Sequence, residues 1–275
     1  MKVICEIVNL PPLAPTSASL MNKLHDEEAA LSELAELVQL DPVLTSKLLR
    51  VANSPYFGMV GRVATLEEAI MVVGTSVSRQ YVLSDLVMGY FNQEPWKGQD
   101  LRAFWNRSLY SAGVCQILAN HCGLSDSMGF TLGLFQRMGS LSLLGLLGAV
   151  YQKAFHANLP SLELAAIELE DFGVEHGQIG GALLEQWNIP EIISQSVGRQ
   201  FCEFEAPDLD GTDLLRCSRH FTDAFLLNTP LTLATISDRH QELFCLNDLT
   251  LLKTQKKANE KFKTFKAIIE GGNVG

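Results

Sequence analysis

Apolar residues along this chain recur at helical spacing, and stretches in which apolar and polar residues alternate are almost absent. Leu44, Leu48 and Val51, for example, follow an i, i+4, i+7 pattern that places all three on one face of a helix. A strand with one buried face would instead alternate at every second residue. The pattern predicts an all-α fold, and the sequence contains no convincing internal repeat or low-complexity segment.

Capping residues mark several helix boundaries. Asp41-Pro42 is a strong start signal, because Asp caps the free amides of the first turn and Pro fits the first helical position. Thr65 and Glu68 form a capping box, and Gly74 closes the helix that follows. The same reasoning predicts further helices over 77–91, 101–122, 161–173, 176–187, 191–201, 212–227 and 248–270.

Turn-forming residues also suggest how the chain is divided. The segment 92–98, which contains Pro95, is the best candidate boundary. We therefore expect an N-terminal helical part, 1–95, a second helical part, 96–208, and a C-terminal helical extension, 209–275. The extension ends in a basic amphipathic helix, which we predict to pack through one apolar face and to leave its lysines in solvent. The predicted apolar face consists of Leu249, Leu252, Phe262, Phe265 and Ile269.

Composition and charge narrow the classes of partner. With 47% hydrophobic and 19% charged residues, the chain resembles a folded globular domain and not a disordered one. Its formal net charge of -10 disfavours nucleic acid and anionic membranes, because both bind basic surfaces. The N-terminus lacks signal-peptide features, and the most apolar run, 141–150, is too short to span a bilayer and is better interpreted as one buried helix. We expect a cytoplasmic protein with no nucleic-acid and no membrane partner, whose six cysteines are free thiols.

The stretch 133–139, Gly-Leu-Phe-Gln-Arg-Met-Gly, interrupts an apolar helical pattern with two polar residues, Gln136 and Arg137. Burying an arginine is unfavourable unless the guanidinium is paired. The stretch therefore predicts a cavity, a charged partner, or the remains of a former site at this place.

Three segments of the chain carry a resemblance when they are taken in order. They are 10–54, which contains Asp41-Pro42 and Ala52-Asn53-Ser54; 65–74, TLEEAIMVVG; and 176–191, which begins HGQIG and ends QWNIPE. Together they resemble the HD-related output domain, or HDOD, over roughly residues 10–201. The resemblance implies a multi-helical HD-domain-like bundle with an N-terminal helical subdomain, followed by a degenerate HD-like part. It also implies a role in bacterial signalling.

The resemblance extends to hydrolases that bind divalent metal ions through a His, a His-Asp pair and a later Asp. The first His of the W-x-H-S pattern falls at Arg107, and the His-Asp pair falls at Gln136-Arg137. The later Asp falls near Cys217, and a further His-His pair found in many relatives falls near 199–201. His176 is the one candidate ligand that remains, and a single imidazole beside arginine does not hold a catalytic metal. We therefore expect no bound metal, no cofactor and no enzymatic activity.

Two interpretations of the arginines remain open. If Arg107 and Arg137 replace ligands of one metal, they lie close together and form an anion site, because guanidinium groups match phosphate or carboxylate geometry. Alternatively, each arginine pairs with an internal carboxylate, such as Asp171 or Glu175, and holds helices together. His176 is either a vestigial ligand or a helix-start histidine that bonds the backbone or a neighbouring carboxylate. The candidate ligand-binding residues are Arg107, Gln136, Arg137 and His176.

The sequence supports two functional hypotheses. The first is a non-catalytic bacterial signalling or regulatory module that binds a protein partner or a small anionic ligand. The alternative is a divergent metal-dependent phosphohydrolase of the HD superfamily. No nucleophile elbow or phosphate-binding glycine loop is visible, so neither motif adds a third chemistry.

Overall fold

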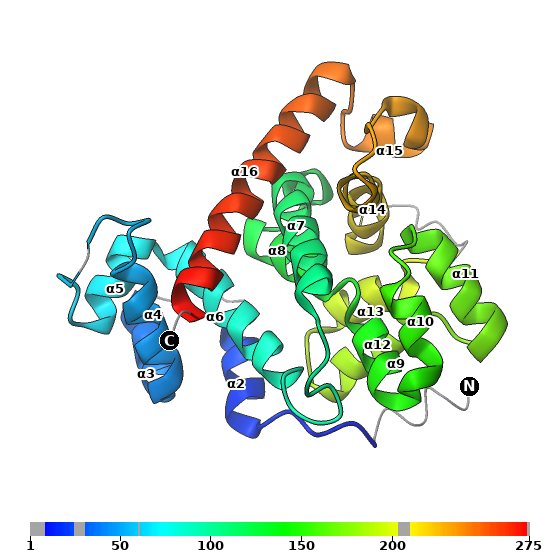
Figure 1. Ribbon diagram of the computed structural model, residues 1–275. Coiled ribbons are helices and arrows are strands. Elements are labelled where there is room, and N and C mark those ends of the chain that lie inside the picture. The colour runs from blue at the N-terminus through cyan, green and yellow to red at the C-terminus, as the bar shows by residue number, and fades with distance from the viewer. Residues whose placement is uncertain (1–8, 25–30, 60, 203–209, 274–275) are drawn as a thin grey trace. The chain divides into compact units, whose positions relative to one another are not determined.

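The chain folds into a series of α-helices in the computed structural model, which describes residues 9–24, 31–59, 61–202 and 210–273 (Figure 1). Within those ranges no β-strand occurs. The predicted all-α fold is thus confirmed. Five cysteines lie in the described ranges, and all five are free thiols; Cys5 lies outside them.

The chain divides into two compact units, and each is built from two separate segments. The larger unit consists of Met1–Pro12 and Gln93–Lys261, and the smaller unit of Leu13–Asn92 and Phe262–Gly275. The division after Asn92 lies within the segment that the turn residues single out. Of the predicted C-terminal extension, the part up to Lys261 belongs to the larger unit and the part from Phe262 to the smaller one, and the three-part division itself stays a prediction.

The smaller unit owes its helix boundaries to local capping. Its helices are α2 (Pro15–Lys23), α3 (Leu31–Gln39), α4 (Pro42–Ala52), α5 (Leu66–Val73) and α6 (Thr75–Tyr90), with the end of α16 (Asp248–Asn273). The Asp41 carboxylate accepts hydrogen bonds from the amides of Val43 and Leu44, at 2.8 and 3.2 Å. Thr65 and Glu68 form the predicted capping box at α5. Both predicted helix starts are confirmed.

Asn53 shows why an asparagine follows α4. Its side-chain amide donates to the carbonyl of Val63 at 2.8 Å, and its side-chain oxygen accepts from the Val63 amide at 3.0 Å. An amide side chain carries both a donor and an acceptor, so it can pair with a backbone as another strand would. The pair ties the start of the loop after α4 to its end.

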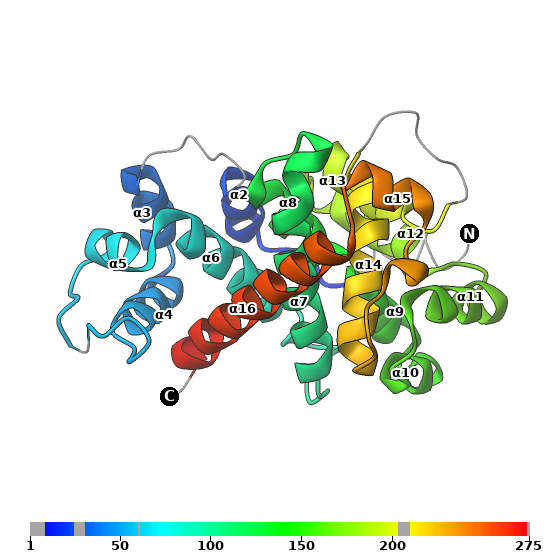
Figure 2. The same cartoon turned by 90° about the horizontal axis from the view of Figure 1, so that it is seen from above.

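The larger unit contains the first half of α16 and most of the remaining elements. They are α7 (Arg102–Leu118), η2 (Ala119–Cys122), α8 (Asp126–Phe135), α9 (Met138–Leu147), α10 (Ala149–His156), α11 (Ser161–Phe172), α12 (His176–Gln186), α13 (Glu191–Arg199), α14 (Gly211–Leu227), η3 (Leu233–Thr235) and α15 (Asp238–Leu243). Figures 1 and 2 show α7 and α8 packed side by side.

Two glycines set the positions of the helices on either side of Gln136-Arg137. A Cβ atom on Gly133 would lie 2.5 Å from the carbonyl oxygen of Ser111, so α8 packs directly on the α7 backbone. A Cβ on Gly139 would lie 1.7 Å from the carbonyl oxygen of His176, so α9 packs equally closely on α12. Only glycine permits such approaches. The stretch 133–139 therefore fixes α7 and α12 around the turn that carries Gln136 and Arg137.

Two details of the predicted helices are wrong. The run 141–150 is not one helix: α9 ends at Leu147, Gly148 has a φ of 54°, and Val150 is 71% exposed in α10.

The segment Asp126–Leu147 is long and apolar enough to cross a membrane by length and composition alone, although 83% of its most apolar window is buried inside the protein.

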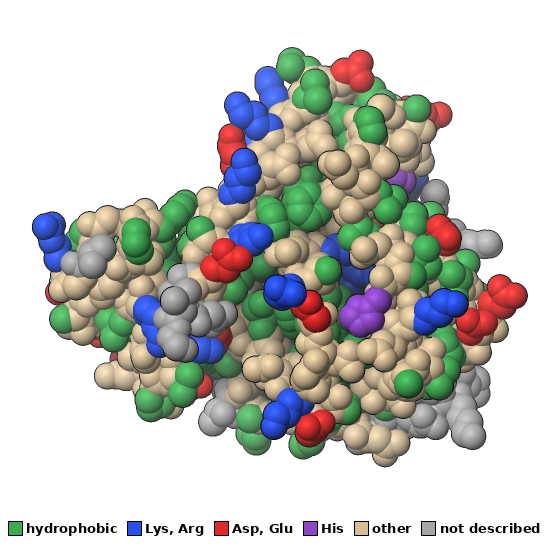
Figure 3. Space-filling model, in the orientation of Figure 1, with side chains coloured by type: hydrophobic (Ala, Val, Ile, Leu, Met, Phe, Trp, Pro, Cys, Tyr) green, Lys and Arg blue, Asp and Glu red, His purple; other side chains and the backbone are tan. Residues whose placement is uncertain are grey.

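The buried face of α16 also differs from the prediction. Leu249 and Leu252 are both 60% exposed, whereas Leu251 and Ala258 are buried in their place. Phe265 and Ile269 are buried as expected. Leucines at 249, 251 and 252 permit more than one apolar stripe, so periodicity alone does not select the register. Figure 3 shows basic side chains along the outer edge of α16, as predicted for its lysines.

Candidate functional site

Gln136 and Arg137 form the turn between α8 and α9, and their side chains have different roles. The Gln136 amide accepts from the Ser111 hydroxyl at 2.6 Å and donates to the Leu215 carbonyl at 3.0 Å. Its backbone carbonyl accepts from the Gln200 side chain at 2.8 Å. Gln136 therefore ties the turn to α7, α13 and α14, and it is buried within these contacts.

Arg107 of α7 lies in an internal ion pair. Its Nη2 donates to the Asp223 carboxylate of α14 and, at 3.0 Å, to the Ser161 hydroxyl. Its Nη1 donates to the Leu159 carbonyl at 3.2 Å. Burial, together with the charge of Arg137, lowers the pKa of Arg107 to about 9, so the group remains charged at neutral pH. One of the two arginines thus has an internal carboxylate partner.

The Asp223 carboxylate also caps helix α11. Oδ2 accepts from the Ser161 amide at 3.0 Å, and Oδ1 accepts from the Ser161 hydroxyl at 2.9 Å. Pro160 precedes the helix and supplies no side-chain cap. A carboxylate at a helix N-terminus is favourable, because it satisfies a free amide and faces the positive end of the helix dipole.

The sequence interpretation did not identify this carboxylate. It named Asp171 or Glu175 as partners for the arginines, and for Arg107 this is wrong, because the partner is Asp223. Glu175 instead caps α12 by accepting from the Gln178 amide at 2.9 Å. The resemblance places the later ligand position near Cys217, which is buried, whereas Asp223 lies further along the same helix. The one feature of the sequence that could have indicated this partner is the acidic residue Asp223 in the last turns of α14.

Arg137 differs from Arg107 in its partners. Its guanidinium is buried, with 6% of the residue exposed, and its Nε, like that of Arg107, has no hydrogen-bond partner. Nη1 lies 3.5 Å from the Ser161 hydroxyl. No carboxylate of the described ranges comes within 4.0 Å of it. Burial lowers the pKa of Arg137, and the more distant Tyr151, Glu168 and Asp223 oppose that shift.

His176 begins α12 and is completely buried. Its Nδ1 lies 2.6 Å from Glu168 Oε2, and the same oxygen accepts from the His176 backbone amide at 2.7 Å. The other Glu168 oxygen accepts from the Tyr151 hydroxyl. Burial lowers the pKa of His176, which favours the neutral imidazole. His176 is therefore the helix-start histidine bonded to a neighbouring carboxylate, as the second interpretation expected.

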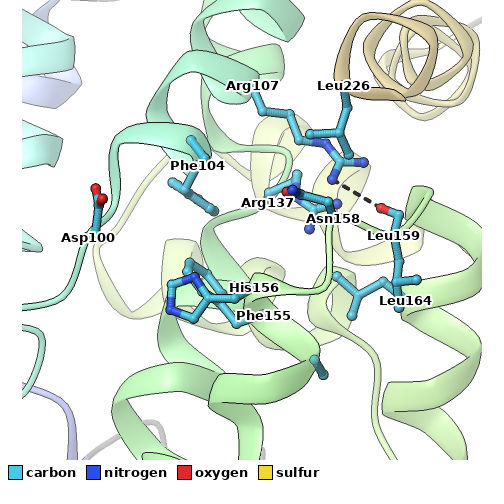
Figure 4. Close-up of a pocket in the computed structure, with 12 residues that line it drawn as sticks. Asp100, Phe104, Arg107, Arg137, Phe155, His156, Asn158, Leu159, Leu164 and Leu226 are labelled. Atoms are coloured by element: carbon cyan, nitrogen blue, oxygen red, sulfur yellow. Dashed lines mark hydrogen bonds between the residues drawn. The ribbon is translucent and has the colours of Figure 1, made fainter. Parts of the chain in front are cut away.

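A cleft with a volume of about 130 Å³ opens beside the two arginines. Figure 4 shows both guanidinium groups at the same end of it, with Asp100 farther away. Phe104 and Phe155 stack on each other in its wall, with ring centroids 5.8 Å apart. Of the four candidate residues, Arg107 and Arg137 line this cleft. The other lining residues are Asp100, Ala103, Phe104, Ala154, Phe155, His156, Asn158, Leu159, Leu164 and Leu226.

A divalent metal, which the resemblance to metal-dependent hydrolases implies, does not fit the residues gathered here. Guanidinium groups carry no lone pair for a metal and repel a cation. His176 could offer a metal only its Nε2, which has no hydrogen-bond partner, because Nδ1 bonds Glu168, and Asp223 is engaged by Arg107. Across the part of the chain that the structure describes, no group of three or more His, Cys, Asp or Glu side chains is suitably placed to hold a metal ion.

Comparison with known proteins identifies the class of this chain. The family model described as HDOD domain matches residues 10–201, so the chain belongs to the HDOD domain family. A curated relative, an uncharacterized protein of Treponema pallidum (strain Nichols), is 24% identical over 199 residues. That alignment covers 70% of this chain and 37% of the relative, so the chain spans little more than a third of its length.

Solved structures share the fold. A “Putative phosphohydrolase” of Shewanella amazonensis SB2B has a TM-score of 0.72 at 23% identity, over 98% of this chain and 96% of its own. A “Putative signal transduction protein” of Marinobacter aquaeolei VT8 has a TM-score of 0.79 at 18% identity, over 96% of this chain and 60% of its own. An HDOD domain protein with unknown function from Geobacter sulfurreducens has a TM-score of 0.72 at 18% identity, over 97% of each chain.

Proposed function

We propose that this chain is a non-catalytic signalling or regulatory module and that it binds a small anionic ligand in the cleft at Arg107 and Arg137. The observation that carries the proposal is Arg137, a buried guanidinium that lines a cleft and has no ion-pair partner in the described ranges. A buried, unpaired charge is unfavourable by several kcal/mol. A guanidinium in this position beside a cleft is explained if an anion from outside the chain binds there and neutralises it.

The size and chemistry of the cleft suit the charged group of a ligand. A guanidinium presents parallel N–H donors that match the oxygens of phosphate or carboxylate. A volume of about 130 Å³ accommodates such a group, but it is smaller than pockets that enclose a whole drug-sized ligand. We therefore expect the anionic group to be held at the arginines while the rest of the ligand extends along the stacked pair of Phe104 and Phe155.

The same residues are poorly suited to hydrolysis. Phosphate ester hydrolysis requires a water activated by a metal ion or by a general base at the substrate. Arginine remains protonated and cannot act as a base. His176 does not line the cleft, and His156, which does, is exposed to solvent and packs edge-on against Phe155. A binding role, in keeping with the signalling function that the HDOD resemblance implies, follows from these features.

Calorimetric titration and thermal shift with phosphate, mononucleotides and cyclic dinucleotides test the proposal. We expect at least one of them to bind the wild type and to raise its Tm at millimolar concentration or below. Arg137→Met should abolish that binding. Arg62→Met, which removes an exposed arginine of the smaller unit, is the matched control and should leave binding unchanged.

Two results would contradict the proposal. The first is the absence of any anion-dependent shift in the folded wild type. The second is turnover of a generic phosphodiester with added manganese, accompanied by stoichiometric metal in the purified protein. The second result would support the divergent phosphohydrolase instead.

A further inference from the structure

The Asp223 carboxylate is held in the way that proteins hold an anionic ligand. It receives a guanidinium from Arg107, a hydroxyl from Ser161 and the first free amide of α11. α11 has 12 residues, and its N-terminus has no local side-chain cap. Helix N-termini combined with arginine are recurrent phosphate sites in proteins. In this structure the anion at such a place is a side chain of the same molecule.

The donor set around Asp223 is larger than one carboxylate requires. Arg137 approaches the same Ser161 hydroxyl at 3.5 Å, and it keeps an unpartnered Nε and no ion pair in the described ranges. Two guanidinium groups therefore converge on Ser161, but only one of them has a carboxylate partner. A phosphate group carries about -1.5 to -2 charges at pH 7 and three acceptor oxygens. Such a group can engage both arginines, whereas one carboxylate here engages Arg107 alone.

We propose that Asp223 occupies the place of a phosphate group, and that a phosphate monoester binds Arg107, Arg137 and Ser161 by displacing the Asp223 carboxylate. This inference rests on the proposed anion-binding function and specifies its ligand class. It makes Asp223 an internal competitor that sets the selectivity of the site.

The position of Asp223 permits its displacement. Its side chain is 18% exposed, whereas the Arg107 side chain is 6% exposed. Leu226, one turn further along α14, lines the cleft, although Asp223 itself does not, and the proposal requires the partly exposed Asp223 side chain to rotate out into solvent. The donors, in contrast, remain fixed by α7 and by the start of α11.

An attached competitor selects for charge. Asp223 is present at a high effective concentration, because it belongs to the same chain. A ligand carboxylate offers the same charge as the group it must displace, so it gains little. A dianionic phosphate gains the interaction with Arg137 and can compete. We therefore expect the wild type to bind inorganic phosphate at least tenfold more tightly than acetate.

Removing the competitor tests the proposal. In Asp223→Asn the side-chain oxygen can still cap the Ser161 amide, but the negative charge is gone. We expect this variant to bind inorganic phosphate at least tenfold more tightly than the wild type, and to gain measurable binding of acetate. Both affinities are measured by calorimetry at constant ionic strength, with chloride as the balancing anion.

Asp213→Asn is the matched control. Asp213 belongs to the same helix, is buried, and pairs with Arg239 at 3.2 Å, and neither residue lines the cleft. This variant should lose stability without any gain in phosphate or acetate affinity. A gain of equal size in both variants would show a general effect of lost charge and would overturn the proposal.

The remaining outcomes are distinguishable. If the wild type binds phosphate and folded Asp223→Asn binds it no more tightly, Asp223 is a structural cap only and the inference is wrong. If neither binds any anion, the proposed function itself fails. Should Asp223→Asn not fold, the wild-type preference for phosphate over acetate decides: equal affinities would overturn the inference.

Discussion

The starts of α11 and α12 lie close together in the sequence, and each is capped by a carboxylate of different origin. At α12 the cap is Glu175, the residue directly before the helix, in a capping box with Gln178. At α11 the cap is Asp223, which lies 62 positions away in α14 and is also bound to Arg107. The local cap has no ion pair in the described ranges and completes a helix. The distant one pairs with Arg107 beside the cleft that Arg137 also lines, and this difference separates a structural terminus from a candidate site.

The contrast predicts that the α11 terminus depends on its ion pair. In Arg107→Met the Asp223 carboxylate stays partly buried without its cation, which typically destabilises a protein by about 3–5 kcal/mol. Urea denaturation of the variant and the wild type measures the loss. A change below about 1 kcal/mol would mean that the pair contributes little and that the two helix termini are equivalent.

The α12 terminus has its own buried polar group, and its loss should have a smaller effect. Glu168 accepts from the His176 amide and imidazole and from the Tyr151 hydroxyl. Glu168→Gln replaces one acceptor oxygen by a donor, so at least one of these hydrogen bonds is lost. Hydrogen bonds to a charged group contribute about 1.5–3 kcal/mol each, and we expect a loss of about 2 kcal/mol. Anion binding at the cleft should be unaffected, which calorimetry with inorganic phosphate checks.

Removal of Arg137, unlike removal of Arg107, should not destabilise the protein. Because it has no ion pair in the described part of the chain, Arg137→Met removes a buried charge whose burial is uncompensated. Without any added anion, we expect the variant to be as stable as the wild type or more stable by about 1 kcal/mol. A loss of 3 kcal/mol or more in denaturation experiments would show that Arg137 is a structural residue like Arg107.

Substitution of Glu175 should have the smallest effect on stability, and that effect should depend on pH. Burial raises the pKa of Glu175 from 4.5 to about 7 in the folded chain. The folded state then binds the proton more tightly than the unfolded state, so this group's contribution to stability declines as pH rises from about 4.5 to about 7. Glu175→Gln lacks the decline, and its stability relative to the wild type should increase over that range. A constant difference between pH 4.5 and 8 would contradict this origin of the shift.

Local signals account for much of the helical framework. Asp41-Pro42 and the Thr65–Glu68 box are read directly from neighbouring residues, because a helix cap depends on contacts within a few positions. The turn residues of 92–98 likewise contain the point at which the two units divide. Signals of lesser specificity led to errors: the apolar run 141–150 contains a helix break at Gly148, and the leucines of α16 allowed the wrong face to be chosen.

The candidate site could be predicted only in part. The interrupted apolar pattern of 133–139 indicates Arg137, and the HDOD resemblance adds Arg107. The sequence interpretation grouped Gln136 and His176 with them, but these two bond inward, to Ser111 and to Glu168, and do not line the cleft. Asp223 was missed because nothing in its surroundings in α14 indicates where that helix packs.

The sequence by itself determined that this chain is helical, where most of its helices begin and end, and which family it resembles. These properties depend on periodicity and on contacts between near neighbours, which the order of residues specifies directly. The tertiary structure decided which arginine is neutralised. Arg107 meets Asp223 across 116 positions, while Arg137 is left beside the cleft without an ion pair among the described residues. Pairing at such a distance depends on how α7, α11 and α14 pack, and helical periodicity carries no record of that packing.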